Sequence, residues 1–269
     1  MSVRHGIGRA LGTAMWLADG RRRAITIDNL RNAYPHAEST WIHTTARHAY
    51  ANLGIVLAEL VRMRSAPAST LRSWIRIPGI ERIGARMANR EPSILLSGHF
   101  GNWELLALVG ALEAGAPFSI VVHPQHNARI NATVEAIRTR FGNILIPMGS
   151  AARPIINTLD NGGTVAFLAD QFADPRLHRP VAFFGRETPT YEAPAQLALK
   201  YSVPLFAAFA NRVPDGSYHA PVVEVPTSDL SYNTSDVLLC TQRHVSLLED
   251  AVRQHPAMWS WQHRRWRPT

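Results

Sequence analysis

The sequence of 269 residues predicts an α/β protein whose single domain is built on a mixed, mostly parallel central sheet flanked by helices. Three observations predict this class. Apolar runs typical of buried strands recur along the chain, helical patterns of about ten to fifteen residues alternate with them, and hydrophobic residues make up 46% of the composition. We expect one domain over 1–269, with an N-terminal helical, membrane-interface part over 1–65 and an α/β core over 90–269.

The N-terminal part contains apolar residues at helical spacing with three arginines directly behind them. They are Ile7, Leu11, Met15 and Ala18, followed by Arg21, Arg22 and Arg23. The segment is too short and too interrupted to span a bilayer, so two interpretations stand: a helix lying in the membrane interface, or an ordinary helix packed on the core. The glycines at 6, 8 and 12 invite a dinucleotide-binding interpretation, but no strand precedes them and we exclude it.

The rest of the chain alternates between strand and helix patterns. The predicted helices span 24–32, 39–63, 80–90, 127–141, 192–202 and 235–254, with others following residue 104 and ending at 159. The predicted buried strands span 93–96, 118–122, 144–148, 164–169 and 181–184. A Pro214-Asp215-Gly216 turn between strands 205–213 and 220–225 predicts that the sheet turns antiparallel at one edge.

The net charge of the chain indicates which classes of partner it binds. With 28 Lys and Arg against 20 Asp and Glu, the net charge is +8, which favours an anionic partner such as a nucleic acid, an acidic membrane surface or a phosphorylated substrate. The chain has no recognisable nucleic-acid-binding motif, and we expect no nucleic-acid partner. Cys240 is the one cysteine, which excludes a disulfide framework. His123 and His126 flank a proline without further ligands at recognisable spacing, and we expect no metal site.

A histidine and a glutamate mark the candidate active site. His99 follows the strand over 93–96, and Glu104 begins the next helix, close enough for its carboxylate to orient the imidazole. A histidine oriented by a carboxylate can act as a general base on a hydroxyl nucleophile. Asp170 ends the strand over 164–169, which places it at the same sheet edge.

Five sequence blocks support a resemblance to a known family. His99-Phe100-Gly101-Asn102-Trp103-Glu104 resembles the H-x-x-x-x-D/E motif of glycerolipid acyltransferases. The other blocks, in chain order, are Asn29-Leu30 with Tyr34-Pro35, Asn127 through Arg138, Asp170-Gln171 with Phe183-Phe184-Gly185, and Trp259-Ser260-Trp261-Gln262-His263-Arg264-Arg265-Trp266. In this order they resemble the lipid A late acyltransferases, the lauroyl and myristoyl transferases of Gram-negative bacteria.

The resemblance implies a glycerol-3-phosphate-acyltransferase-like fold and a set of site residues. His99 would be the catalytic base and Glu104 the acid that holds its tautomer. Substrate-binding roles would fall on Arg138, Asp170, Gln171 and Asn102. Two roles are open for Asp170, positioning a substrate hydroxyl or pairing with Arg138. Arg138 and backbone N–H groups after His99 are candidate oxyanion donors. No cofactor is expected, because a thioester is already an activated acyl group.

The resemblance also implies the substrates and the place of action. The donor would be an acyl carrier protein thioester or acyl-CoA, and the acceptor a hydroxyl of a membrane glycolipid, most simply lipid A or a lipid A-like molecule. Another amphiphile is an alternative acceptor, such as a phosphatidylinositol mannoside-like glycolipid, a lysophospholipid or a lipopeptide. A non-catalytic lipid-binding protein is the other alternative. The expected location is the cytoplasmic face of the inner membrane, with peripheral attachment to the membrane surface.

Overall fold

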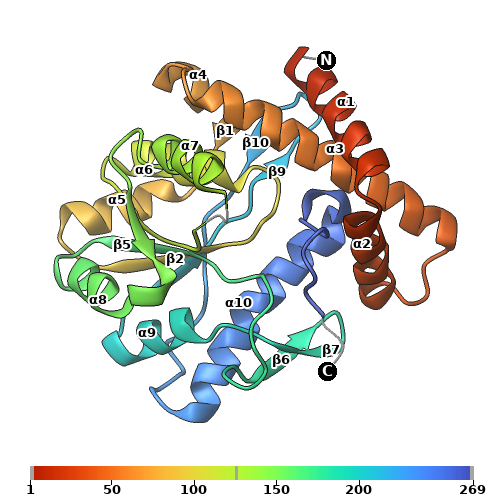
Figure 1. Ribbon diagram of the computed structural model, residues 1–269. Helices are drawn as coiled ribbons and strands as arrows, with labels where there is room; N and C mark the ends of the chain where they lie inside the picture. Colours follow the sequence, from red (N-terminus) through yellow and green to blue (C-terminus); the bar gives the residue numbers. More distant parts are fainter. Residues whose placement is uncertain (1–2, 125–126, 267–269) are drawn as a thin grey trace.

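A computed structural model of the chain describes residues 3–124 and 127–266. Its centre is a six-stranded sheet in the order β11-β8-β2-β5-β3-β4. At the middle of this sheet β2 and β5 lie side by side (Figure 1). The strands are β2 (Ser93–Ser97), β3 (Ser119–Val122), β4 (Ile144–Pro147), β5 (Thr164–Leu168), β8 (Leu205–Ala207) and β11 (Val223–Glu224). Neighbouring strands are parallel except for β11, which runs antiparallel to β8 at one edge. The predicted α/β class and antiparallel edge are confirmed.

Helices cover both faces of this sheet. One face carries α5 (Ile80–Ala88), α6 (Trp103–Ala114) and α7 (Ala128–Arg138), and the other α8 (Ala152–Asp160), α9 (Ala193–Tyr201) and α10 (Thr234–Gln254). Along β2, Leu95 joins the core under α6, while Ile94 and Leu96 join the core under α8 and α9. Because both faces are buried, the strand is a continuous apolar run without alternation.

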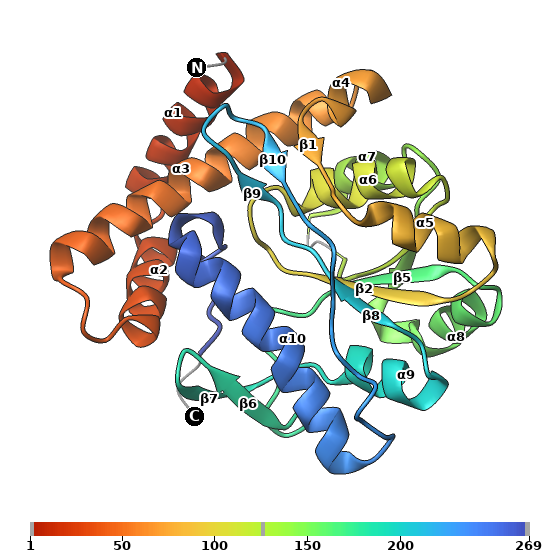
Figure 2. The same cartoon turned by 180° about the vertical axis from the view of Figure 1, so that it is seen from behind.

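Three helices form the N-terminal part, and α1 lies along α3 (Figure 2). They are α1 (Val3–Ala18), α2 (Gly20–Ala33) and α3 (Ser39–Met63). The α1 glycines allow the two helices to touch, because a Cβ at Gly12 would lie 2.2 Å from the Tyr50 carbonyl oxygen. Likewise a Cβ on Gly54 of α3 would lie 2.1 Å from the Gly8 carbonyl oxygen. These glycines therefore serve helix packing.

The exposed side of α1 is largely apolar, although Arg9 and Thr13 are also exposed. Ile7 is 60%, Leu11 39% and Leu17 71% exposed. Within the described ranges, no helix has both the length and the apolar character needed to cross a membrane. The helix predicted over 24–32 begins earlier, at Gly20, because the Asp19 side chain accepts the Arg22 N–H at 2.9 Å and caps it.

The remaining elements are small. They are α4 (Ala68–Arg72), β1 (Ile75–Arg76), β6 (Pro180–Phe183), β7 (Arg186–Pro189), β9 (Asn211–Arg212), β10 (Tyr218–His219) and the 3-10 helices η1 (Met148–Ser150) and η2 (Pro256–Met258). The strand predicted over 205–213 is wrong in its extent, because the chain leaves the central sheet after Ala207 and forms β9, which pairs with β10 beside β1. The backbone at Ala210 instead bridges to Gly101, in the loop that follows β2.

Candidate active site

The sheet register brings the two predicted strand ends together. In the parallel β2–β5 pair, Ser97 lies opposite Leu168, so the loops that follow begin side by side. His99 and Asp170 come from these two loops, as the sequence predicts for one edge of the sheet. Gly98 makes this approach possible, because a Cβ there would lie 3.2 Å from Oδ2 of Asp170.

Asp170 contacts His99 through both of its carboxylate oxygens. Oδ1 lies 2.8 Å from Nδ1 of the His99 ring, and Oδ2 accepts the His99 backbone N–H at 2.8 Å. The Trp259 indole also donates to Oδ2, at 2.8 Å. Burial alone would raise the pKa of Asp170, but His99 and the Trp259 hydrogen bond outweigh it and lower that pKa to about 2. A buried, ionised carboxylate thus holds one side of the imidazole.

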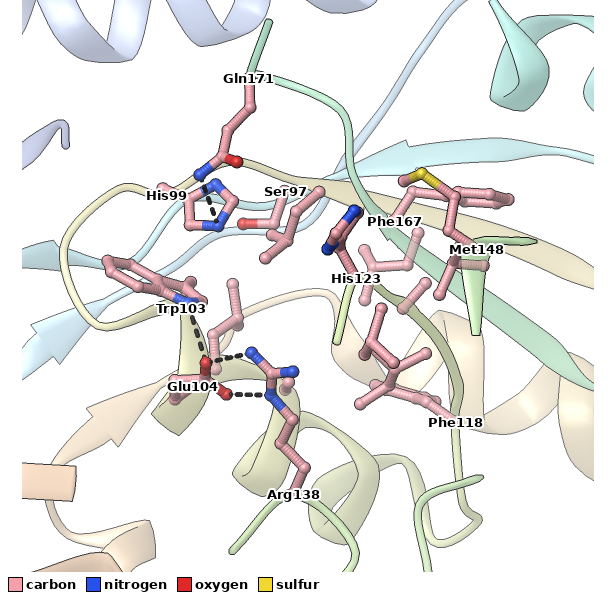
Figure 3. Close-up of a pocket in the computed structure, with 18 of the residues that line it drawn as sticks. Ser97, His99, Trp103, Glu104, Phe118, His123, Arg138, Met148, Phe167 and Gln171 are labelled. Atoms are coloured by element: carbon pink, nitrogen blue, oxygen red, sulfur yellow. Dashed lines mark hydrogen bonds and ion pairs between the residues drawn. The ribbon is translucent and has the colours of Figure 1, made fainter. Parts of the chain in front are cut away.

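Glu104 has a different partner from the one expected. Its carboxylate receives Nε–H of Arg138 at 2.8 Å and Nη2–H at 2.5 Å (Figure 3). Burial opposes the charge on Arg138, but these hydrogen bonds raise the pKa of the guanidinium. The Trp103 indole packs edge-on against His99, with ring centroids 5.0 Å apart, and donates to Glu104 at 3.1 Å.

These contacts correct two expectations and leave a third as a prediction. Glu104 does not orient the His99 ring, because the Trp103 indole contacts both residues and the Glu104 carboxylate is bonded to the guanidinium of α7. Asp170 neither pairs with Arg138 nor presents a free carboxylate to a substrate hydroxyl, because His99 and Trp259 occupy it. Arg138 directs two of its five N–H groups to Glu104 and lines the cavity, so its role as an oxyanion donor stays a prediction.

Asn102 is also placed differently from the expectation. It is fully buried, and its side-chain oxygen accepts the Leu105 N–H at 2.9 Å, capping α6. Its amide donates to the buried Glu59 at 2.9 Å, which also receives the Tyr218 hydroxyl at 2.7 Å. Asn102 does not line the cavity beside His99. The structure therefore assigns it to the framework of the motif instead of to substrate contact.

Gln171 lies on the open side of the imidazole. Its amide nitrogen is 3.2 Å from Nε2 of His99, and Figure 3 shows the amide directed at the ring. An amide N–H donates, so Nε2 accepts and the ring proton lies on Nδ1, facing Asp170. This is the tautomer that a general base at Nε2 requires.

An apolar cavity of about 440 Å³ opens beside His99. Its inner wall comes from the face of the sheet under α6 and includes Leu95, Phe118, Ile120 and Ala166. His99, Trp103, Glu104, Arg138 and Gln171 lie among its lining residues. His123 also lines it, whereas His126 lies outside the described residues. The cavity has the size and lining typical of a site for an extended apolar ligand.

The C-terminal segment over residues 258–266 packs against the loop that carries His99. Ser260 N–H donates to the His99 carbonyl at 2.9 Å, and Gly101 N–H donates to the Met258 carbonyl at 2.8 Å. The Asn29 amide in turn donates to the carbonyls of Trp261 at 2.8 Å and His263 at 2.7 Å. The tryptophans at 259 and 261 are buried, so this segment packs on the core.

Trp259 is a residue of the candidate site that the sequence did not indicate. Its hydrogen bond to Asp170 helps to keep that carboxylate ionised, and the W-x-W block was the available signal. Arg265 is buried in the same segment and donates to the Gln171 and Pro189 carbonyls, at 2.9 and 2.8 Å. The sequence blocks that contain His99, Asp170-Gln171 and Trp259 through Arg265 therefore meet at one site.

Together these features define a class of protein. A base at Nε2 beside an apolar cavity can remove a proton from a hydroxyl that attacks a long-chain acyl group, which is the chemistry of an α/β acyltransferase. Comparison with known proteins agrees. The profile of the bacterial lipid A biosynthesis acyltransferases matches residues 1–268, and the chain belongs to this family. The resemblance recognised in the sequence is confirmed, and the protein is an acyltransferase.

Individual relatives are distant but aligned over most of their length. The lipid A biosynthesis myristoyltransferase of Escherichia coli strain K12 is 24% identical over 246 residues, covering 90% of this chain and 73% of that protein. Lipid A biosynthesis acyltransferase 1 of Shigella flexneri is also 24% identical over 246 residues, with the same coverage of 90% and 73%. Acyltransferase 2 of Shigella flexneri is 22% identical over 259 residues, covering 95% and 79%.

Proposed function

We propose that the protein transfers a fatty acyl group from an acyl thioester to a hydroxyl of a lipid A-like glycolipid, with His99 as the general base. The single observation that carries this proposal is the hydrogen-bonded His99–Asp170 pair, whose imidazole lines the apolar cavity. Membership of the lipid A acyltransferase family supports the acceptor class. Acyl carrier protein and coenzyme A are the two candidate carriers of the thioester, and the basic net charge of +8 suits either, because both are anionic.

The reaction proceeds in one displacement through a tetrahedral intermediate. The acceptor hydroxyl replaces the Gln171 amide beside Nε2 of His99 and attacks the thioester carbonyl carbon while its proton passes to Nε2. Asp170 stabilises the imidazolium that forms. The carbon–sulfur bond then breaks, the ester remains on the acceptor, and the departing thiolate takes the proton from His99. The donor chain lies in the cavity between β3, β5 and α6 during these steps.

The test uses purified protein, an underacylated lipid A and labelled donors of both kinds. Wild type is expected to transfer label from one carrier to lipid A. His99→Ala is expected to lose about a hundred- to ten-thousand-fold of the rate, the usual contribution of a general base. His43→Ala is the matched control, because His43 is an exposed histidine of α3 outside the site.

Three outcomes contradict the proposal. Transfer to lipid A by His99→Ala at the wild-type rate would remove the role of His99. Transfer only to a lysophospholipid or an inositol mannoside would replace the acceptor. Binding of lipid without transfer from either donor would leave a lipid-binding protein in place of the enzyme.

We further propose peripheral attachment to the cytoplasmic face of the inner membrane through α1. The exposed Ile7, Leu11 and Leu17 form an apolar outer face, and the exposed Arg21 and Arg22 lie directly behind it. Apolar residues next to arginines suit an anionic interface, where each cation contributes about 1 kcal/mol. Ile7→Ser with Leu17→Ser should lower the fraction of protein that floats with anionic vesicles. Unchanged flotation of this double variant would reject α1 as the attachment site.

A further inference from the structure

A second apolar depression lies on the opposite face of the sheet from the first cavity. It measures about 550 Å³ and runs between α8 and α9, which lie next to each other in both ribbon views (Figures 1 and 2). Ile155 and Ile156 line it from α8, Leu197 lines it from α9, and Phe167 of β5 lies beneath. We call this depression the α8–α9 groove.

The groove and the first cavity meet at the carboxyl edge of the sheet. The residues that line both are Val121, Met148, Phe167, Leu168 and Tyr191. His99 lines the cavity and is not among the residues that line the groove. A ligand in the groove would therefore reach the catalytic edge from the side opposite to the chain in the cavity.

The groove carries few polar side chains. Lys200 is exposed and His178 is half-buried, and both line the groove. Among the described residues that line it, none is acidic. The wall is otherwise dominated by aliphatic and aromatic side chains, which favours a hydrocarbon chain.

We propose that the α8–α9 groove binds an acyl chain of the acceptor lipid. This inference rests on the proposed function. The thioester carbonyl must lie beside His99, so the donor chain takes the cavity that His99 lines. The acceptor is an amphiphile whose hydroxyl must reach the same imidazole while its own chains avoid water. The groove offers an apolar surface that ends at the shared wall of Phe167, Leu168 and Tyr191.

Filling the groove tests the proposal. Ala152 begins α8 and Ala193 begins α9, and both are exposed alanines that line the groove. Ala152→Trp and Ala193→Trp place an indole in the groove without overpacking a buried core. Ala85→Trp is the matched control, because Ala85 is an exposed alanine of α5 that lines neither depression.

Each protein is assayed with two acceptors, an underacylated lipid A with long chains and an analogue with the same headgroup and short chains. We expect both groove variants to lower kcat/KM for the long-chain acceptor at least about tenfold, the loss from displacing two or more buried methylenes. Their kcat/KM for the short-chain acceptor, their donor KM and their donor chain-length preference should match wild type. Ala85→Trp should match wild type in every measurement.

The other outcomes overturn the inference. Equal loss with both acceptors would mean that the substitutions damage the enzyme generally. A changed donor chain-length preference would assign the groove to the donor, and unchanged kinetics would leave it without a substrate chain. Failure of wild type to acylate either acceptor would instead reject the proposed function, and this inference with it.

Discussion

Asp170 fixes His99 at two atoms, the ring nitrogen Nδ1 and the backbone nitrogen, each 2.8 Å from a carboxylate oxygen. The imidazole and the loop that carries it are thus held by one buried side chain, and Trp259 secures that side chain in turn. The orienting carboxylate therefore comes from the loop after β5, and Glu104 binds Arg138 of α7 instead.

Asp170→Asn should therefore disable the enzyme without unfolding it. The amide keeps the shape of the carboxylate but cannot stabilise the imidazolium, so kcat should fall about a hundred- to ten-thousand-fold. Acyl transfer assays beside thermal unfolding check this. If His99 and Asp170 act as a unit, adding His99→Ala should cost little more. Full activity in Asp170→Asn together with an inactive Glu104→Gln would return the orienting role to Glu104.

The Glu104–Arg138 pair should contribute strongly to stability and show coupling. The two side chains are only 8% and 14% exposed, so removing one leaves a buried charge and should cost about 3–5 kcal/mol in unfolding free energy. Glu104→Gln with Arg138→Met should cost clearly less than the sum of the single changes. Denaturant unfolding of the four proteins measures this, and simple additivity would contradict the pairing.

An exposed ion pair is the control for the stability cost of breaking the buried pair. Arg72 and Glu113 are 2.7 Å apart but 49% and 40% exposed. Arg72→Met should cost no more than about 1 kcal/mol, because solvent screens such a pair.

The sequence was sufficient to place the site at one sheet edge. His99 and Asp170 each follow an apolar run, and parallel strands present their ends at the same edge, so their proximity is a consequence of topology. Which carboxylate faces the ring was not predictable in the same way. Glu104 is nearer to His99 in the sequence. The sequence spacing alone does not indicate that the Trp103 indole contacts both residues.

Long-range contacts account for the other differences. Nothing local to Asn102 indicates that its amide meets Glu59, 43 positions earlier in the chain. The break in the strand predicted over 205–213 likewise depends on the approach of Gly101 to Ala210. Helix α3, by contrast, ends at the predicted Met63 and begins at Ser39, one residue after its N-cap Glu38, because a long periodic pattern encodes its own buried face.

Gly101 should be irreplaceable for a steric reason. Its φ of +55° is unfavourable for other residues, and a Cβ there would lie 1.6 Å from the Ala210 carbonyl oxygen. Gly101→Ala should destabilise the protein by more than the approximately 1–2 kcal/mol of backbone strain alone. Gly185 separates the two effects, because it has φ +70° and nothing within 4 Å of its Cβ position. Equal costs for Gly101→Ala and Gly185→Ala would contradict the close approach.

Ala107 should control the length of the donor chain. It lies on α6 and lines the cavity beside Leu106 and Phe118. Ala107→Leu fills part of the volume available to the acyl chain, so the preferred donor chain should be shorter by about one to three methylenes. The transfer rate should change less with short-chain donors than with long-chain donors. Competition among donors of graded length measures the preference. Ala85→Leu on α5 should leave it unchanged, and an unchanged preference in Ala107→Leu would place the chain elsewhere.

His244 should make the protein less stable in mild acid. It is buried in α10, and its Nε2 has no hydrogen-bond partner among the described residues. Burial lowers its pKa from 6.5 to about 4, so between these values the unfolded chain binds the extra proton and the folded chain does not. Stability is therefore retained above pH 6.5 and falls as the pH decreases toward 4, by about 3 kcal/mol over the full range.

His244→Leu removes this titration, so its unfolding free energy should change less than that of wild type between pH 7 and about 4.5. The Asp170 carboxyl does not interfere, because its pKa of about 2 against an ordinary 3.8 places its contribution to acid unfolding below this interval. His48→Gln, a change at an exposed histidine of α3, should keep the wild-type slope. Denaturant unfolding across this pH series measures all three slopes. Parallel slopes for His244→Leu and wild type would show that His244 does not titrate as a buried neutral group.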